Sequence, residues 1–504
     1  MTQQTAIRRV LIVGGGTAGW MTAAMLARVM GPQLHIRLIE SDAIGTVGVG
    51  EATIPAIQHF NAALGINEAE FLTATQGSIK LGIQFENWGK LGEQYMHAFG
   101  PIGKPLGFTS FHHYWLAARA RGDNSSFWDY SLNYQAARSG KYQPLAQIPN
   151  TPLQGLIHAY HFDAGLYAAF LRRYSERLQV IRSEGTIAAV SKTPAGDIAS
   201  VTLADGQTFS ADLFIDCSGI RALLIGQELN VGYENWQHWL PCDSALAVPT
   251  AARQPILPYT RSIAHAGGWQ WRIPLQHRTG NGLVYSSQYL DDNAARHTLL
   301  TNLDAEVLAE PRKISFVTGR RKQQWQQNCV AIGLSSGFLE PLESTSIHLI
   351  QSAIVRLVQS FPASHDMAAL RQNYNQQSQQ EFEAIRDFII LHYCLNQRDD
   401  NGLWQYCRSM ALPDSLAQRI ALFQQSAAVF RQQDELFTEV AWQQVMLGQN
   451  VLPQQYHPLA DQLTAAQLNG FLGDIKLIMQ RTAAKLPSHQ AFLQQVQQAQ
   501  QAQQ

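Results

Sequence analysis

This chain of 504 residues contains few charged side chains and few cysteines for its length. Asp, Glu, Lys and Arg make up 15% of it, and 37 basic against 38 acidic residues leave a net charge of −1. A nearly neutral chain has no overall field that would attract nucleic acid or an anionic membrane surface. The five cysteines are scattered without a CxxC pair, which argues against a disulfide framework and indicates a reducing compartment.

Long hydrophobic runs are also absent. No run approaches the roughly 18 apolar residues that a transmembrane helix needs, and the apolar run near the N-terminus is too short for a signal peptide. We therefore expect a cytoplasmic protein with neither a membrane nor a nucleic-acid partner, and the sequence indicates no metal site. Hydrophobic residues still make up 46% of the chain, which is enough for a large core.

A glycine-rich turn near the N-terminus is the clearest local pattern. Apolar residues 8–13 and 35–41 flank three consecutive glycines and a stretch of helix formers. This order predicts a strand, a turn, a helix and a second strand, which is the context of the dinucleotide-binding motif GxGxxG. The helix would direct its free N–H groups at a pyrophosphate. The residues concerned are Gly14, Gly16, Thr17, Ala18 and Gly19.

Acidic residues end two of the apolar runs. Glu40 closes the second strand, where it would accept a hydrogen bond from a ribose hydroxyl. Asp216 ends the run LFID, where it either contacts a ligand or caps the following turn. A tight turn with no ligand is the alternative for the glycine motif itself.

The remaining pattern suggests three regions. Apolar runs also end at Gly219 and Gly333, and with the first run they are expected to meet at one end of one sheet. Residues 185–219 and 257–290 alternate as strands do, and the sequence becomes helical beyond about 346. The last fifteen residues hold nine glutamines, which indicates a frayed helix or disorder. We expect an α/β nucleotide-binding core, an inserted antiparallel sheet and a helical C-terminal part.

Four further segments could carry chemistry or only structure. The loop 48–55, rich in small residues, allows a ligand to approach the backbone or is a surface turn. The loop 334–348 precedes an amphipathic helix whose first N–H groups form an anion site, with Glu343 beside it; a capped helix and a solvated acid are the alternative. Lys80 lies in an apolar run, where a lysine usually reaches out to solvent. Trp269 and Trp271 would share one face of a strand, as ligand contacts or as a core pair.

Taken together, these segments resemble the flavin-dependent tryptophan halogenase family. The resemblance rests on GGGTAGW at 14–20, GVGEATIP at 48–55, the Lys80 segment ending in Asn87-Trp88, WQWRIP at 269–274 and FLEPLESTS at 338–346, all in that order. It extends from residue 8 to about 350. It implies an FAD-binding, Rossmann-like core of the monooxygenase type in residues 1–390, and a mostly helical region, 391–504, that covers the substrate side.

The resemblance also implies the activity. A separate flavin reductase would supply FADH2, and O2 with chloride or bromide would yield hypohalous acid beside the flavin. That oxidant would pass to Lys80, which presents electrophilic halogen to an aromatic carbon, while Glu343 polarises the oxidant or accepts the ring proton. A homodimer is one assembly that fits. Two alternatives stay open: a flavin-dependent aromatic hydroxylase on the same fold, and a flavoprotein without catalysis.

Residue roles follow from the same resemblance. Thr345 and Ser346 match the family's halide contacts, and His97 and Phe99 match its aromatic walls for an indole, unless they form an exposed pair. The tryptophan pair at 269 and 271 is expected to keep substrate from the flavin. The matched flavin contacts are Gly14, Gly16, Ala18, Glu40, Gly50, Leu334 and Ile347, with Asp216 added.

The substrate is expected to differ from free tryptophan. The family's tryptophan enzymes hold the amino-acid head group with adjacent tyrosines and an acid, and residues 436–457 contain no such segment. The segment between Lys80 and His97 is short, and Ser346 stands where the family often has glycine. A smaller indole or another electron-rich aromatic is therefore the predicted substrate.

Overall fold

The computed structural model describes residues 6–43, 50–432 and 435–502. The chain divides into two compact units, and each unit is assembled from three separate segments. Unit 1 comprises residues 1–76, 162–243 and 315–383, and unit 2 comprises 77–161, 244–314 and 384–504. The boundary predicted at residue 390 remains a prediction.

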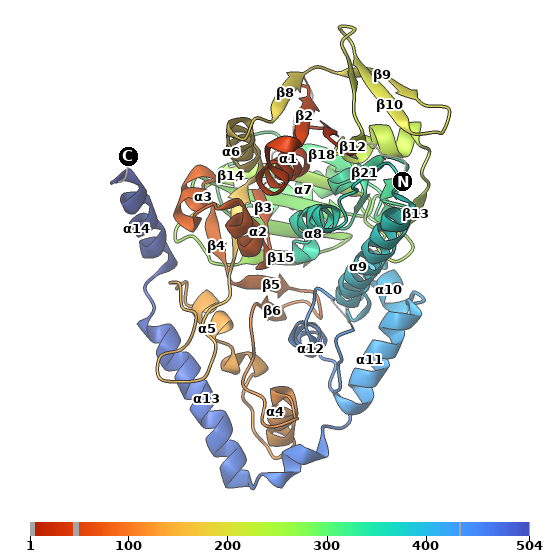
Figure 1. Cartoon of the computed structure of the whole chain (residues 1–504). Coiled ribbons are helices and arrows are strands. Elements are labelled where there is room, and N and C mark those ends of the chain that lie inside the picture. Colours follow the sequence, from red (N-terminus) through yellow and green to blue (C-terminus); the bar gives the residue numbers. More distant parts are fainter. Residues whose placement is uncertain (1–5, 44–49, 433–434, 503–504) are drawn as a thin grey trace. The chain divides into compact units, whose positions relative to one another are not determined.

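A six-stranded sheet forms the centre of unit 1 (Figure 1). In sheet order its strands are β20 (Trp325–Gln326), β21 (Cys329–Ala331), β12 (Leu213–Asp216), β1 (Arg9–Val13), β2 (His35–Glu40) and β8 (Ile181–Glu184). β1 pairs in parallel with β2 and β12, and β12 pairs in parallel with β21. The three glycine-terminated runs are thus adjacent parallel strands, which confirms that they meet at one edge of one sheet.

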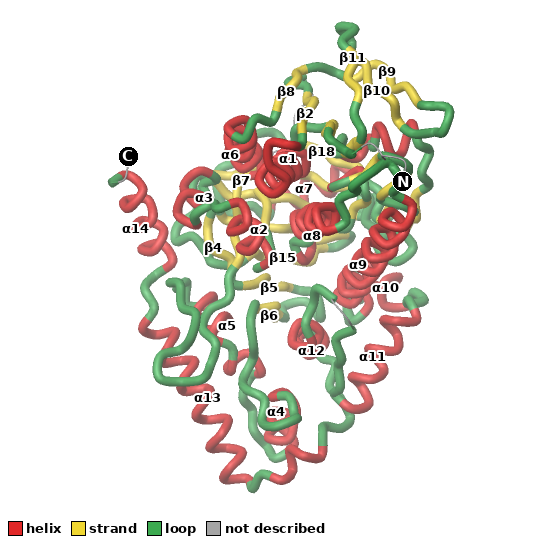
Figure 2. The backbone as a smooth tube through the Cα atoms, viewed as in Figure 1, coloured by secondary structure: helices red, strands yellow, loops and turns green. Residues whose placement is uncertain are grey.

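Helices and small sheets complete unit 1. Helix α1 contacts α2, α6 and α8, and Figure 2 shows β9, β10 and β11 as a separate small sheet. The helices are α1 (Thr17–Met30), α2 (Ala56–Leu64), α3 (Glu68–Ala74), α6 (Ala164–Arg177) and α8 (Ser346–Gln359), and α9 (Ala368–Cys394) continues into unit 2. The other strands are β3 (Gly50–Ala52), β9 (Ile187–Lys192), β10 (Ile198–Leu203), β11 (Thr208–Ser210), β13 (Tyr233–Asn235), β19 (Gly319–Arg321) and β22 (Gly337–Phe338).

Unit 2 contains the inserted sheet, which has seven strands. In sheet order they are β18 (Arg312–Ser315), β14 (Ser244–Ala251), β17 (Arg278–Tyr285), β16 (Gly268–Pro274), β15 (Thr260–His265), β5 (Gly82–Glu86) and β6 (Gln94–Ala98). β14 with β17, β17 with β16, β16 with β15, and β5 with β6 pair antiparallel, whereas β15 and β5 pair in parallel. A short separate strand, β4 (Ser78–Lys80), pairs antiparallel with β7 (Ala159–Asp163).

The helical C-terminal part is confirmed. The helices of unit 2 are α4 (Phe111–Ala120), α5 (Leu132–Arg138), α7 (Asp292–Thr301), α10 (Gly402–Ser409), α11 (Asp414–Ser426), α12 (Glu439–Gly448), α13 (Ala465–Lys485) and α14 (His489–Gln501). The glutamine-rich tail forms α14, which Ser488 caps by accepting from the N–H of Ala491. Phe492 packs edge-on against Tyr142 at 4.8 Å, so apolar residues among the glutamines anchor the helix.

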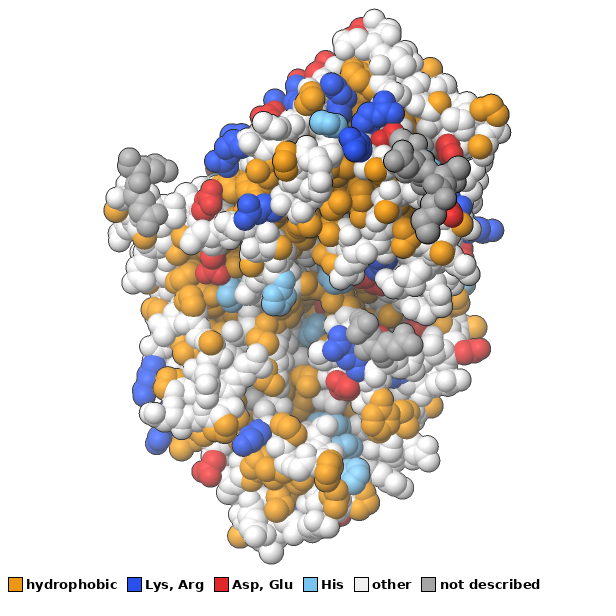
Figure 3. All heavy atoms as spheres, viewed as in Figure 1, with side chains coloured by type: hydrophobic (Ala, Val, Ile, Leu, Met, Phe, Trp, Pro, Cys, Tyr) orange, Lys and Arg blue, Asp and Glu red, His pale blue; other side chains and the backbone are white. Residues whose placement is uncertain are grey.

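Surface chemistry agrees with the balanced composition. Figure 3 shows basic and acidic side chains scattered among neutral ones on the visible face. Among the described residues, no helix is long and apolar enough to cross a membrane.

Candidate functional site

Three glycines shape the loop between β1 and α1. Gly14 has a φ of +112°, and a Cβ there would lie 2.1 Å from the carbonyl oxygen of Cys217. At Gly19 a Cβ would lie 1.8 Å from the carbonyl oxygen of Gly14. At Gly16, the residue before α1, an added Cβ meets nothing within 4 Å. Gly14 and Gly19 are therefore required by packing, whereas the space beside Gly16 and the start of α1 at Thr17 is open to a ligand.

Glu40 lies at the end of β2, as the sequence predicts, but protein groups already bind its carboxylate. The indole N–H of Trp20 donates to Oε2 at 3.2 Å, and Arg182 and Arg172 pair with Oε1. The arginines hold the carboxylate at this edge of the sheet and compensate its charge. A ribose hydroxyl would have to share it with them.

Asp216 caps the turn that follows β12. Its Oδ1 accepts from the backbone N–H and the hydroxyl of Ser218, and its Oδ2 accepts from the N–H groups of Leu224 and Ile225 at 2.9 and 2.8 Å. The residue is fully buried. The turn therefore uses both carboxylate oxygens, which is the second of the two interpretations that the sequence left open.

The loops after β1, β12 and β21 come together in unit 1. A Cβ at Gly333 would lie 2.8 Å from the Cβ of Ala18, and the hydroxyl of Ser335 donates to the carbonyl oxygen of Asp216. Leu334 is 37% exposed on this loop. Thus the residues predicted to contact flavin from the glycine motif and from the 334 loop are neighbours.

The second predicted flavin loop is described only in part. Gly48 and Val49 lie outside the described residues, and Gly50 is buried at the start of β3. Burial raises the pKa of the next residue, Glu51, to about 7. Glu51 is not among the residues predicted from the sequence, although a carboxyl group in a segment of mostly small and apolar residues is a signal for a perturbed acid.

The start of α8 has the features of an anion site. Ser344 adopts a left-handed conformation (φ +60°), which turns the chain into the helix. Thr345 precedes the first helical residue, yet its side chain does not cap the helix. Its Oγ1 is buried and has no hydrogen-bond partner within the described part of the chain. Both Glu343 and Thr345 are fully buried, and Ile347 is 2% exposed, while Ser346 is partly exposed.

Lys80 is fully buried in unit 2. It ends β4, and its Nζ lies 5.3 Å from the ring centre of Phe99. His97 contacts Phe99 edge-on at 6.3 Å. Both aromatic residues are buried, at 5% and 7% exposure, so the interpretation as an exposed pair is wrong. Unit 2 thus brings together Lys80, His97 and Phe99, as the resemblance implies.

Other aromatic side chains, missed from the sequence, complete this cluster. Phe388 lies 5.7 Å from His97 and stacks on Phe437 at 3.7 Å, and Trp442 packs edge-on against Phe388 at 4.9 Å. Helix α12 is fixed beside β6 because the amide of Gln444 bonds to both the N–H and the carbonyl of Ala98. The signal for this cluster in the sequence was the presence of aromatic residues, Phe437 and Trp442, in the segment 436–457, which was already considered for substrate binding.

Trp269 and Trp271 lie on β16, with ring centres 6.2 Å apart. Trp269 is 1% exposed and also contacts Trp88 at 6.3 Å, whereas Trp271 lies over Gly282, where a Cβ would meet its ring at 2.1 Å. The pair therefore packs in the interior of unit 2, and its predicted role towards substrate stays a prediction.

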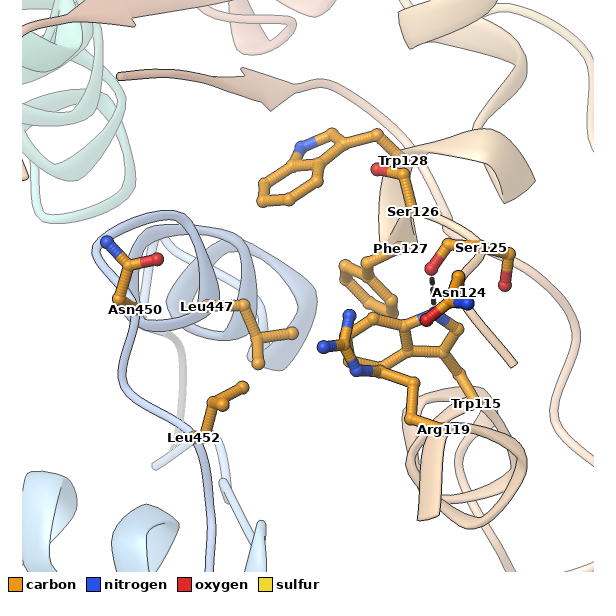
Figure 4. Close-up of a pocket in the computed structure, with 10 residues that line it drawn as sticks. All are labelled: Trp115, Arg119, Asn124, Ser125, Ser126, Phe127, Trp128, Leu447, Asn450 and Leu452. Atoms are coloured by element: carbon orange, nitrogen blue, oxygen red, sulfur yellow. Dashed lines mark hydrogen bonds between the residues drawn. The ribbon is translucent and has the colours of Figure 1, made fainter. Parts of the chain in front are cut away.

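A separate surface pocket of about 330 Å³ lies in unit 2 (Figure 4). Trp115 and Trp128 face it, and the indole N–H of Trp115 donates to the carbonyl of Ser125. None of the predicted substrate residues is among those that line it, which are Trp115, Arg119, Asn124, Ser125, Ser126, Phe127, Trp128, Leu447, Asn450 and Leu452.

Comparisons with known proteins identify the family. The tryptophan halogenase family model matches residues 9–465, well beyond the position near 350 where the resemblance was expected to end. A tryptophan 6-halogenase of Streptomyces toxytricini is 38% identical over 82% of this chain and 83% of its own length. A tryptophan 7-halogenase of Lentzea aerocolonigenes is 36% identical over 84% and 83%.

Solved structures agree with this result. A flavin-dependent halogenase from Xanthomonas campestris shares 50% identity and superposes with a TM-score of 0.95, over 98% of this chain and 99% of that one. A flavin-dependent halogenase from Brevundimonas shares 42% identity with a TM-score of 0.94, over 97% and 99%. The predicted α/β fold class is thereby confirmed. Because the family model covers most of the chain and these relatives are closely similar to it, the chain belongs to the tryptophan halogenase family of flavin-dependent enzymes.

Proposed function

We propose that this protein uses FADH2, O2 and a halide to halogenate a small indole or a similar electron-rich aromatic, and that Lys80 presents the halogen. The observation that carries the proposal is the full burial of Lys80 with its amine beside the ring of Phe99. A lysine that only serves solubility would keep its charged end in water, because burying an ammonium group is costly.

Residues of unit 1 fit a bound FAD. The open space at Gly16 and the N–H groups at the start of α1 suit its pyrophosphate. Glu40 would hold a ribose hydroxyl together with Arg182, and Asp216 would act by fixing the adjacent loop. When bound, the reduced flavin supplies the electrons that activate O2. The remaining proposed contacts are Thr17, Ala18, Gly19, Gly50, Leu334 and Ile347.

The start of α8 fits a halide. The N–H groups of its first turn have no carbonyl partner within the helix, and the positive end of the helix dipole favours an anion. The buried hydroxyl of Thr345 is a further donor that the described residues leave without a hydrogen bond. Thr345 and the N–H group of Ser346 would together strip and hold a chloride or bromide ion. Glu343, buried beside them, would move the proton that this chemistry requires.

In unit 2, Lys80 would accept or hydrogen-bond the electrophilic halogen. Phe99, His97, Phe388 and Trp442 would form the walls that orient an aromatic ring by stacking and edge contacts. Trp269 and Trp271 would exclude substrate from the flavin. The walls are apolar, which favours a compact indole without a charged head group.

Other parts of the proposal concern supply and setting. A separate reductase would deliver FADH2, and the helical region 391–504, through α12, would cover the aromatic cluster. We also propose a cytoplasmic location, and a homodimer remains open to measurement.

One assay tests the proposal. The purified chain is mixed with a flavin reductase, FAD, NADH, O2 and bromide or chloride, and offered indole, substituted indoles and free tryptophan. Mass spectrometry should show the halogen isotope pattern on indoles, with free tryptophan converted more slowly. Reactions without halide are the control. Hydroxylated products in place of halogenated ones would favour a monooxygenase. Faster turnover of free tryptophan than of any indole would contradict the proposed substrate class.

A further inference from the structure

The strand that carries Lys80 is short and lies at the edge of its sheet. β4 has three residues and pairs with β7 through Ser78 opposite His161 and Lys80 opposite Ala159. An edge strand presents backbone groups that no neighbouring strand satisfies. A three-residue edge strand contributes few ladder bonds, so other groups must hold it if Lys80 is to keep one position.

A histidine from the C-terminal helix binds this edge. The backbone N–H of Ile79 donates to Nε2 of His489 at 3.1 Å, across 410 residues of sequence. Nδ1 of His489 lies 2.9 Å from the carbonyl oxygen of Ile256 and donates to it. A neutral imidazole is required for this arrangement, because an imidazolium has no lone pair to accept from Ile79. His489 is fully buried, and burial lowers its pKa to about 4.

A second histidine, His161, holds Ser78, whose side chain lies on the same face of β4 as that of Lys80. The hydroxyl of Ser78 donates to the carbonyl of Pro274 at 2.6 Å, so it accepts from Nδ1 of His161 at 3.0 Å. Nε2 of His161 then accepts from the hydroxyl of Thr260 at 2.9 Å. Burial, and to a lesser extent the nearness of Lys80 and His489, keep the pKa of His161 well below its ordinary value.

We infer that His489 is a positioning residue for Lys80, and that α14 is therefore a working part of the halogenation site. Two buried histidines, His161 at Ser78 and His489 at Ile79, fix the strand immediately before the lysine. The first comes from the adjacent strand and the second from the end of the chain. This inference rests on the proposed role of Lys80.

The test compares His489→Gln with His489→Leu in the full-length protein. The glutamine amide can accept from Ile79 and donate to Ile256, whereas leucine can do neither. With saturating reductase, FAD and bromide, we expect His489→Leu to lower halogenated indole formation by roughly 10- to 100-fold, because small displacements of a reacting group have effects of that order. FADH2 oxidation and the KM for indole should stay unchanged, and hypobromous acid should appear in a scavenger assay. His489→Gln should restore the coupling, which is the fraction of oxidised FADH2 that yields halogenated indole.

Two controls separate positioning from folding. Gln494→Ala alters an exposed residue of α14 and should behave as wild type. Phe492→Ala loosens the packing of α14 on Tyr142 while keeping His489. It should therefore lower the Tm but change the coupling of FADH2 oxidation to halogenation only a little. If His489→Leu does not fold, His489→Asn replaces it, since the shorter amide does not span both partners and should couple less well than glutamine.

The outcomes distinguish the two claims. Wild-type coupling in His489→Leu, or equal coupling in the glutamine and asparagine variants, would overturn the role of His489. Halogenation by Lys80→Ala at the wild-type rate would overturn the proposed function itself. An inactive Lys80→Ala with a fully coupled His489→Leu would leave the proposed function standing and refute only the positioning role.

Discussion

The amine of Lys80 lies 5.3 Å from the ring centre of Phe99, and both residues are buried in unit 2. A cation at this distance is attracted to the face of an aromatic ring, and a neutral amine there faces an apolar surface. This pairing of an amine with an aromatic ring fits the proposed transfer of halogen from Lys80 to a flat substrate.

The first prediction concerns Lys80. Lys80→Ala should abolish halogenated product while FADH2 oxidation continues, because the alanine variant loses the proposed transfer step and keeps the proposed flavin contacts of unit 1. Product is measured by mass spectrometry and flavin oxidation by absorbance. Lys90→Ala, at an exposed lysine of unit 2, is the matched control and should retain full activity. Full activity in Lys80→Ala would remove the lysine from the mechanism.

The second prediction concerns Glu343. Glu343→Gln keeps the shape of the side chain and removes the proton-accepting group, so turnover should fall by about 100-fold or more, the usual size of a general acid–base contribution. FAD affinity, followed by fluorescence, should not change. Glu70→Gln, at an exposed acid of unit 1, serves as the control. Unchanged turnover would leave Glu343 with a purely structural role in its loop.

The third prediction separates binding from stability at Thr345. Its buried Oγ1 makes no hydrogen bond to the described residues, so Thr345→Val removes a polar atom without breaking a protein contact. The ligand-free variant should be as stable as wild type or slightly more stable. The KM for halide should rise. Loss of stability with an unchanged halide KM would show that the hydroxyl serves the fold.

The fourth prediction contrasts two glycines. Gly14→Ala should abolish soluble expression, because its φ is +112° and a Cβ would overlap the Cys217 carbonyl. Gly16→Ala should fold normally, since its Cβ would enter open space, but should bind FAD more weakly. Circular dichroism and FAD titration measure the two effects. Wild-type FAD affinity in Gly16→Ala would mean that the pyrophosphate does not approach this loop.

The fifth prediction is a pH dependence of stability. Burial lowers the pKa of His112 and of His489 to about 4, from an ordinary value near 6.5. The unfolded chain therefore binds more protons than the folded chain below pH 6.5. Stability should be complete above that pH and should fall, as the pH drops from 6.5 to 4, by up to about 1.4 kcal/mol per pH unit for each histidine.

Urea unfolding at pH 7.0, 6.0 and 5.0 measures this slope. His489→Gln should flatten it, because glutamine does not titrate, whereas Gln494→Ala, at an exposed residue of α14, should leave it as it is. A slope that is the same in wild type and in His489→Gln would show that His489 does not titrate as described.

Much of unit 1 follows from local sequence. The glycine turn, the strand ending at Glu40 and the meeting of three strand ends could be predicted because backbone geometry and parallel pairing depend on short segments. The function of Asp216 could not, since capping and ligand contact require the same residue at the same place. Only the coordinates show that the N–H groups of the following turn bind its carboxylate.

The nucleotide-binding turn, the α/β class, the family resemblance and the choice of Lys80 as a candidate catalytic residue could all be predicted from the sequence. The tertiary structure alone decided what surrounds that lysine: Phe388 and Trp442 complete the aromatic cluster, and His489 reaches the backbone of Ile79 from a tail that reads as low complexity. The difference lies in how far apart in the sequence the interacting residues are. Turns and strands depend on neighbouring residues, whereas a buried polar contact between distant segments depends on how the whole chain packs, which no local pattern records.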